Sequence, residues 1–235
     1  MNGAFLGLET SGRTTGLALV KDKRVVWEKR TPNEVSHNES LLPLIDTAFA
    51  QTEIKLNELT GICLTIGPGM FTSLRVGLSV TKGLAVARGL LVKGINTLRA
   101  LSFTAETERG NQLVLSLIDA RKGEVYAGLY QGGEAIIAPK VVSPEGLARL
   151  LGQTNLSSNS LVIAGDGAEL AEPVLKKAGY HIDRIGITFP SPVAVIRLGI
   201  DLLVKEGGDD ITKLEPTYLR RTDAELKREP RQSDS

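Results

Sequence analysis

Residues 61–88 read GICLTIGPGMFTSLRVGLSVTKGLAVAR, which places a strand, a tight turn and a helix in immediate succession. The run 61–66 is short and apolar, which favours a buried strand. Gly67-Pro68-Gly69 then predicts a turn, because glycine and proline adopt the backbone conformations that turns need. The remainder of the stretch is predicted to be a helix, with Thr72 or Ser73 as its N-cap.

The same succession occurs a second time, in residues 161–178, which read LVIAGDGAELAEPVLKKA. Working outward from the first copy, we predict strands at 4–8, 15–20, 24–29, 61–66 and 90–95 and helices at 39–51, 71–88 and 97–108. Around the second copy we predict strands at 113–118, 124–130, 135–142, 161–164 and 182–187 and helices at 144–151, 168–178 and 192–206. Each half therefore has the order βββαβαβα.

This duplicated order predicts an α/β protein. Strands joined by short turns are expected to be antiparallel neighbours, and strands separated by helices are expected to be parallel. Two such units with a cleft between them are typical of the actin-like fold of the actin and sugar-kinase superfamily. We expect one subdomain over 1–109, which carries the partner-binding helices, a second over 110–222, and a flexible tail over 223–235.

The composition of the 235-residue chain excludes several classes of protein. With 42% apolar and 23% charged residues and a net charge of +1, it lacks the basic excess of a protein that binds nucleic acid through its own surface. Cys63 is the sole cysteine, so no disulfide framework is possible, and no His/Cys spacing predicts a metal site. We expect no membrane segment, no signal peptide and a cytoplasmic location.

Several motifs carry a resemblance to a known family. The segment 67–78 reads GPGMFTSLRVGL and is followed by KGLA at 82–85, and residues 119–126 read DARKGEVY. Thr97-Leu98 and PTYLR at 216–220 extend the match over nearly the whole chain. Together these motifs resemble the TsaB (YeaZ) family. The chain departs from the family pattern at Glu9, where the family usually has Asp, and at Ser73, where it often has Gly.

The resemblance implies a function without catalysis by this chain. It implies a scaffold or regulatory subunit of the complex that forms N6-threonylcarbamoyladenosine at position 37 of tRNAs reading codons that begin with A. It implies a TsaD-like catalytic partner, a TsaE-like ATPase and self-pairing, with tRNA contacted through the complex. ATP, ADP and metal are then expected on the partners, with no cofactor required here. The alternatives are an ATP-binding enzyme of the actin-like superfamily and a glycoprotease-like peptidase.

The predicted helices at 39–51 and 71–88 suggest where a partner binds. A helix that lies on its own sheet needs one apolar stripe, but the second helix is apolar nearly all round. Small residues recur in it every four positions, which permits close approach of another helix. We predict as partner-binding residues Leu41, Leu42, Ile45, Phe49, Phe71, Ser73, Arg75, Val76, Gly77, Val80, Thr81 and Leu84. The alternative is that these side chains pack internally.

A second candidate site is a degenerate nucleotide cleft at the ends of the first strands. Its predicted residues are Glu9, Thr10, Ser11, Asp119, Gly165, Asp166 and Gly167. Residues 120–122 all carry side chains, which hinders approach of the backbone to a phosphate, and no P-loop motif is present. The alternative is that Asp119 caps its own turn or pairs with Arg121 across the cleft. No histidine stands in a recognisable relation to Thr10 or Ser11, so a peptidase triad is not predicted.

Overall fold

The computed structural model describes residues 1–32, 37–154 and 160–220. The predicted order of elements is confirmed in the first half. Its elements are β1 (Ala4–Glu9), β2 (Gly16–Lys21), β3 (Arg24–Arg30), α1 (His37–Thr52), β4 (Leu59–Gly67), α2 (Phe71–Arg88), β5 (Leu91–Asn96) and α3 (Thr97–Arg109). The second half repeats it with β6 (Val114–Arg121), β7 (Glu124–Gln131), β8 (Glu134–Val142), α4 (Pro144–Gly152), β9 (Leu161–Ala164), α5 (Ala168–Lys177), β10 (Ile182–Arg184) and α6 (Pro192–Glu206). A short 3-10 helix (Leu56–Glu58) precedes β4.

The two sheets have the same topology. The first has the strand order β3-β2-β1-β4-β5. The second, read from its β8 edge, has the order β8-β7-β6-β9-β10, in which each strand takes the place of its counterpart in the first sheet. In each, the first strand of the half pairs antiparallel with the second and parallel with the fourth, as the connections predict. All six residues of β1 are buried, because both faces of the sheet are covered. The duplicated architecture predicted from the sequence is therefore confirmed.

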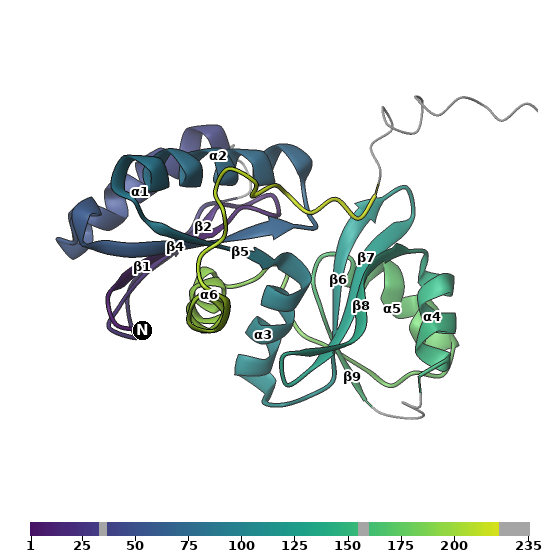
Figure 1. Cartoon of the computed structure of the whole chain (residues 1–235). Helices are drawn as coiled ribbons and strands as arrows, with labels where there is room; N and C mark the ends of the chain where they lie inside the picture. The colour runs from purple at the N-terminus through teal and green to yellow at the C-terminus, as the bar shows by residue number, and fades with distance from the viewer. Residues whose placement is uncertain (33–36, 155–159, 221–235) are drawn as a thin grey trace, which may run out of the picture.

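The helices that cover these sheets are exchanged between the halves. Helices α1 and α2 lie together on one face of the first sheet, whereas α6, from the end of the second half, covers its other face (Figure 1). Helix α3 belongs by sequence to the first half, but its Leu98, Leu101 and Ala105 pack in a cluster with β6 of the second sheet. Helices α4 and α5 cover the remaining face of that sheet. Packing therefore crosses the predicted division at 109/110, which itself stays a prediction.

Two glycines allow α6 to lie close to the first sheet. A Cβ at Gly7 of β1 would lie 2.5 Å from the carbonyl oxygen of Pro192, and a Cβ at Gly199 would lie 2.3 Å from Sγ of Cys63. The buried Cys63 thiol packs in this interface, where burial raises its pKa to about 12. Cys63 therefore serves as a small apolar residue in this interface.

After α6 the chain returns along the molecule as a segment without helix or strand, residues 207–220, which includes a turn at 211–213 and which we name the C-terminal strap (Figure 1). The N–H of Asp209 donates to the carbonyl of Val92 at 2.8 Å, and the N–H of Thr217 donates to the carbonyl of Ile66 at 2.7 Å. Arg220 then donates to the carbonyl of Ala120 at 2.8 Å, in the second half. The strap therefore touches both halves, while the predicted flexible tail at 223–235 lies outside the described residues.

Two local predictions are wrong. The N-cap of α2 is Met70, whose backbone oxygen accepts from the N–H of Leu74 at 3.0 Å, so Thr72 and Ser73 lie within the helix. Strand β10 ends at Arg184 instead of reaching residue 187, because it pairs with only three residues of β9. Within the described part of the chain, no helix combines the length and the apolar character that crossing a membrane requires.

Candidate functional site

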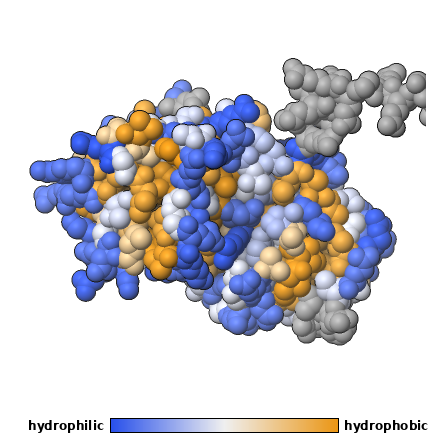
Figure 2. Space-filling view, viewed as in Figure 1, coloured by the Kyte–Doolittle hydropathy of each residue, from blue (hydrophilic) through white to orange (hydrophobic). Residues whose placement is uncertain are grey.

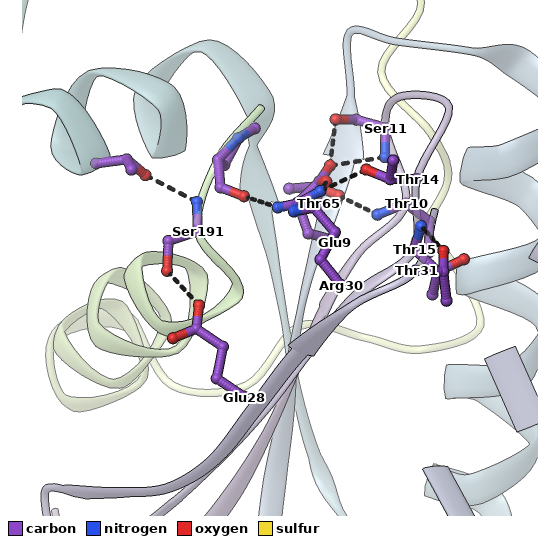
Figure 3. Close-up of polar contacts among 12 residues, drawn as sticks. Glu9, Thr10, Ser11, Thr14, Thr15, Glu28, Arg30, Thr31, Thr65 and Ser191 are labelled. Carbon is purple, nitrogen blue, oxygen red and sulfur yellow. Dashed lines mark hydrogen bonds and ion pairs between the residues drawn. The ribbon is translucent and has the colours of Figure 1, made fainter. Parts of the chain in front are cut away.

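The candidate cleft begins at Glu9, the last residue of β1, whose carboxylate is completely buried. The backbone N–H of Ser11 donates to Oε1 of Glu9 at 2.8 Å, and the Ser11 hydroxyl contacts the same oxygen. Nη1 of Arg30, at the end of β3, lies 2.7 Å from Oε2 (Figure 3). Both carboxylate oxygens are therefore bonded within the chain and face no open site.

Arg30 is a residue that sequence reasoning missed. Its guanidinium also donates to Oγ1 of Thr14 at 2.8 Å and to the carbonyl of Pro190, just before α6. Beside it, the Ser191 hydroxyl bonds Glu28 at 3.0 Å and the Ser191 N–H donates to Thr104, also at 3.0 Å (Figure 3). These polar groups join β3 and α3 to the start of α6. Their arrangement holds these elements together.

The equivalent position in the second half is Asp119 in β6. Its Oδ1 accepts from the backbone N–H of Arg121 at 2.7 Å, and its Oδ2 lies 3.0 Å from Nη1 of the same arginine. The alternative for Asp119, a cap on its own turn, is what the structure shows, and its pair with Arg121 lies within that turn instead of across the cleft. Its N–H donates to Oδ1 of Asp166 at 2.9 Å, and burial raises the pKa of that second carboxyl. The cleft residues of the second half are thus brought together, and they bond one another.

The backbone amides of the cleft are also bonded internally. The N–H of Met70 donates to the carbonyl of Ser11 at 2.8 Å, and the N–H of Gly165 donates to the carbonyl of Ile187, also at 2.8 Å. The N–H of Gly167 donates to the carbonyl of Leu117 at 3.1 Å, and that of Thr10 donates to the side chain of Thr65. A phosphate bound here would have to displace these contacts before it could be cradled by amides.

The space that remains in the cleft is small. The cavity has a volume of about 180 Å³, below the range of roughly 300–1,000 Å³ typical of ligand pockets. Gly12, which lines the cavity, packs closely on the ring of Phe189, from which an added Cβ would lie only 2.1 Å. Over residues 1–32, 37–154 and 160–220, no three His, Cys, Asp or Glu side chains gather as metal ligands would. The geometry of the cleft supports a structural role.

The second candidate site is a groove between α1 and α2, which we name the α1–α2 groove. It has a volume of about 450 Å³ and is lined by Leu41, Leu42, Phe71, Thr72, Arg75, Val76, Ser79 and Val80. Leu42 is 53% exposed and Phe71 is 41% exposed, although both are large apolar side chains. An apolar groove with such side chains at its margins is typical of a surface that another protein covers.

Part of the predicted partner face is buried within the chain, so its role in partner binding stays a prediction. Leu41 and Ile45 are almost fully buried on the inner face of α1, although Leu41 also lines the α1–α2 groove. The predicted ridge of small side chains in α2 faces its own sheet, where a Cβ at Gly77 would lie 2.4 Å from Oγ1 of Thr10. Ser73 and Thr81, on the same ridge, are buried with it. Their small size therefore serves the packing of α2 on the first sheet.

The other predicted partner residues remain accessible in part. Leu42, Phe71 and Arg75 are exposed, and the half-buried side chains are Phe49, Val76, Val80 and Leu84. The half-buried set packs against the core of the first half on one side and reaches the surface on the other. The accessible part of the face is thus narrower than the sequence suggested and centres on the α1–α2 groove.

Tyr218 of the C-terminal strap joins this face, which no sequence spacing predicted. Its ring lies against that of Phe71, with 5.2 Å between the centroids, and its hydroxyl accepts from Nε of Arg75 at 3.0 Å. The Arg75 guanidinium lies 3.6 Å from the centroid of the Phe71 ring, a cation–π contact. Tyrosine and arginine are enriched among the residues that dominate binding energy in interfaces. This stack provides a preformed anchor at one end of the groove.

Comparisons with known proteins agree over most of the chain. The family model described as "TsaD: tRNA N6-adenosine threonylcarbamoyltransferase" matches residues 8–191. The tRNA threonylcarbamoyladenosine biosynthesis protein TsaB of Bacillus subtilis is 28% identical, with 95% of this chain and 96% of that protein covered. The protein of the same name from Escherichia coli is 26% identical, with 92% and 94% covered.

Solved structures of YeaZ and of a YeaZ-like protein also resemble this chain over most of its length. YeaZ from Pseudomonas aeruginosa has a TM-score of 0.77 at 26% identity and covers 93% of this chain and 100% of its own. A protein described as similar to peptidase YEAZ, from the same organism, has a TM-score of 0.80 at 27% identity, with 94% and 100% covered. Component A of (R)-2-hydroxyglutaryl-CoA dehydratase from Acidaminococcus fermentans, at 10% identity and a TM-score of 0.51, shares the fold alone. The predicted actin-like class is confirmed.

Proposed function

Because the chain belongs to the family described as TsaD, tRNA N6-adenosine threonylcarbamoyltransferase, and within it to the TsaB (YeaZ) group, we propose that it is a non-catalytic scaffold subunit in tRNA threonylcarbamoyladenosine biosynthesis. Its partner is a TsaD-type catalytic subunit, which it binds and activates. A TsaE-type ATPase joins the pair, the chain pairs with itself when alone, and tRNA is contacted through the complex. ATP, ADP and metal are bound by the partner subunits.

The observation that carries this proposal is the contrast between the two candidate sites. In the cleft, the carboxylates of Glu9 and Asp119 are both engaged in bonds within the chain. In the α1–α2 groove, large apolar side chains such as Leu42 and Phe71 are exposed instead. Removing apolar surface from water is the main favourable term in protein association. The chain is therefore better equipped to bind a protein than to turn over a substrate.

The groove also suggests how the partner binds. Helices α1 and α2 lie side by side on the first sheet (Figure 1), and two helices from a partner can pack across them as a four-helix layer. Leu42 and Val80 then become the centre of the interface, and the Phe71–Arg75–Tyr218 stack closes one end. Burial of a large apolar side chain contributes roughly 1.5–3 kcal/mol, so a few such residues can dominate the affinity.

The test compares groove and off-groove substitutions in binding to the TsaD-type subunit. We expect Leu42→Arg and Val80→Arg each to weaken binding at least about tenfold, because a charge is then buried in an apolar interface. Val86→Arg is the matched control, since Val86 is on the same helix, is 77% exposed and does not line the groove. Isothermal titration calorimetry measures binding, and circular dichroism melting establishes that each variant is folded.

A reconstituted tRNA threonylcarbamoylation assay tests the function itself. With the partner proteins present, we expect modification to require this chain and to fall for the two groove variants but not for Val86→Arg. An ATP titration of the chain alone is run in parallel, together with Asp119→Ala. Saturable ATP hydrolysis that Asp119→Ala abolishes would contradict the scaffold proposal and support an enzyme. Equal partner affinity in all three arginine variants would contradict the position of the interface.

A further inference from the structure

A second groove lies on the opposite face of the first sheet from α1 and α2, along α6. We name it the α6 groove. It has a volume of about 560 Å³ and is lined by Met1, Val20, Lys23, Phe103, Arg197, Ile200, Asp201, Val204 and Lys205. Three elements build it: the β2–β3 hairpin, α3 and α6. None of its residues belongs to the cleft or to the α1–α2 groove.

The floor of the α6 groove is apolar and open. Val204 is 62% exposed and Met1 is 41% exposed, and Phe103 and Ile200 pack against the core cluster between α6 and the first sheet. Phe103, Asp201 and Lys205 also line an adjoining depression of about 190 Å³, so the two hollows are neighbours. Figure 2 shows apolar surface on this half of the molecule with hydrophilic side chains at its margins. The floor provides the apolar area that a docked segment would cover.

The rim carries three exposed cations, Lys23, Arg197 and Lys205, and one carboxylate, Asp201. Within the described part of the chain, none of the three cations lies within ion-pair distance of a carboxylate. Other lysines do have such partners, as in Lys21–Glu58 at 3.2 Å and Lys176–Glu172 at 2.7 Å. In a chain whose net charge is only +1, this is a local excess of positive charge.

The charges change along the groove. The adjoining depression replaces Lys23 and Arg197 with the carboxylates Glu106 and Glu134, together with Arg99. The cationic excess is therefore confined to the part of the groove with the largest apolar floor. A ligand that fits must present apolar side chains to the floor and carboxylates to the rim at the Lys23–Arg197 end.

We propose that the α6 groove is a docking site for an acidic amphipathic segment of a partner protein, distinct from the partner surface at α1 and α2. An amphipathic segment buries its apolar side chains on Val204, Ile200 and Phe103 and pairs its carboxylates with Lys23, Arg197 and Lys205. A nucleic acid would satisfy the cations but would leave the exposed apolar floor uncovered. Because the two grooves lie on opposite faces of the first sheet, both can be occupied in one assembly.

The test uses the full chain and defined probes in fluorescence anisotropy. The probes are a labelled acidic amphipathic helical peptide, a peptide of the same composition with a scrambled order, a basic peptide with the same apolar face, and a single-stranded RNA. We expect the acidic amphipathic peptide to bind most tightly, and its affinity to fall as salt is raised. Equal binding of the scrambled peptide, tighter binding of RNA, or no binding of the acidic peptide would each overturn the proposal.

Variants then locate the site. We expect the double substitution Arg197→Glu with Lys205→Glu to weaken binding of the acidic peptide roughly tenfold or more. Val204→Ser should also weaken binding of the acidic peptide. Because Val204 is exposed, this substitution should leave the protein folded. The matched control is Arg149→Glu with Lys177→Glu, which reverses two exposed cations on α4 and α5 of the other half. An equal loss of affinity for the acidic peptide in the control variant would overturn the location of the site. Binding to the TsaD-type subunit is measured separately and reports on the α1–α2 groove alone.

Discussion

Glu9 is a buried carboxylate whose two oxygens bond Ser11 and Arg30, which lies 21 residues away in the chain. The two side chains of this ion pair differ in burial: that of Glu9 is inaccessible to solvent, whereas that of Arg30 is 31% exposed. Such a carboxylate depends on its partner, since an unpaired charge in this position would lack both water and a counter-ion. Its role in stability can therefore be separated from a role in binding a ligand.

We expect Glu9→Gln to lower the free energy of unfolding by about 3 kcal/mol, the lower end of the range for breaking a buried pair, because Arg30 is partly exposed. Urea denaturation measures this change. Glu28→Gln is the matched control, with an exposed carboxylate bonded to Ser191 at 3.0 Å, and its loss should stay within about 1 kcal/mol. A gain in stability from Glu9→Gln would contradict the structural role, because removal of a strained functional group commonly stabilises a protein.

At the scale of residues, the sequence predicted local pairs and missed distant ones. Asp119 and Arg121 are two positions apart, so their pairing follows from turn geometry. The bonds from Arg30 to Glu9 and from Arg75 to Tyr218 join residues 21 and 143 positions apart. Spacing along one chain carries no information on such contacts, because they form only after the strands and the C-terminal strap have taken their places.

Helix α6 approaches the first sheet at Gly7, where any side chain would meet backbone. The nearest atoms to a Cβ at Gly7 include the carbonyl oxygen of Pro192, at 2.5 Å. A backbone atom cannot move aside as the tip of a flexible side chain can, so the helix itself would have to shift. The close contact between α6 and β1 thus rests on the absence of one methyl group.

We expect Gly7→Ala to lower the free energy of unfolding by about 1–3 kcal/mol, as overpacking does in well-packed cores. Gly83→Ala is the control: it lies in α2, is exposed and has no neighbouring atom within 4 Å of an added Cβ. That change should stabilise the protein by about 0.5–1 kcal/mol, because alanine favours the helix. Thermal and urea unfolding measure the change in the free energy of unfolding for both substitutions. A change of the same sign in the two variants would contradict the close contact between α6 and β1.

At the scale of elements, periodicity predicted α2 with its correct bounds but not what each face covers. The residues Ser73, Gly77, Thr81 and Ala85 recur every four positions and form one buried row. Small side chains permit close approach of any neighbour, so the pattern fits a partner helix and an underlying sheet equally well. Only the three-dimensional structure shows that the sheet takes this row and that Phe71, Arg75 and Val80 face the groove.

The whole molecule is held together by exchanged helices. The second face of the first sheet is covered by α6, whose Val195, Ile196 and Leu203 pack with Phe5 and Cys63. Helix α3, in turn, packs on the second sheet. The sequence predicted both duplicated units, because their order of elements repeats, but each helix has an apolar face that does not specify its sheet. The exchange is a property of the complete chain.

This architecture predicts that the first half does not fold alone. We expect a fragment of residues 1–109 to show no cooperative thermal unfolding and to bind hydrophobic dyes, because it lacks α6 and the second sheet on which Leu98, Leu101 and Ala105 of α3 pack. A fragment of residues 1–220, which contains every described element, is the control and should unfold cooperatively. Differential scanning calorimetry measures both, and a cooperative transition in the shorter fragment would contradict the interdependence of the halves.

The exchange of α6 also sets an order of events during synthesis on the ribosome. The last strand of the first sheet ends at Asn96, yet the helix that covers one face of that sheet ends at Glu206. At synthesis rates of roughly 5–20 residues per second, the interval is about 5–20 s. For that time the apolar residues that α6 later covers stay exposed, which makes them a binding site for a chaperone. A slow translation step between these two points would prolong the exposure, without any change in the finished protein.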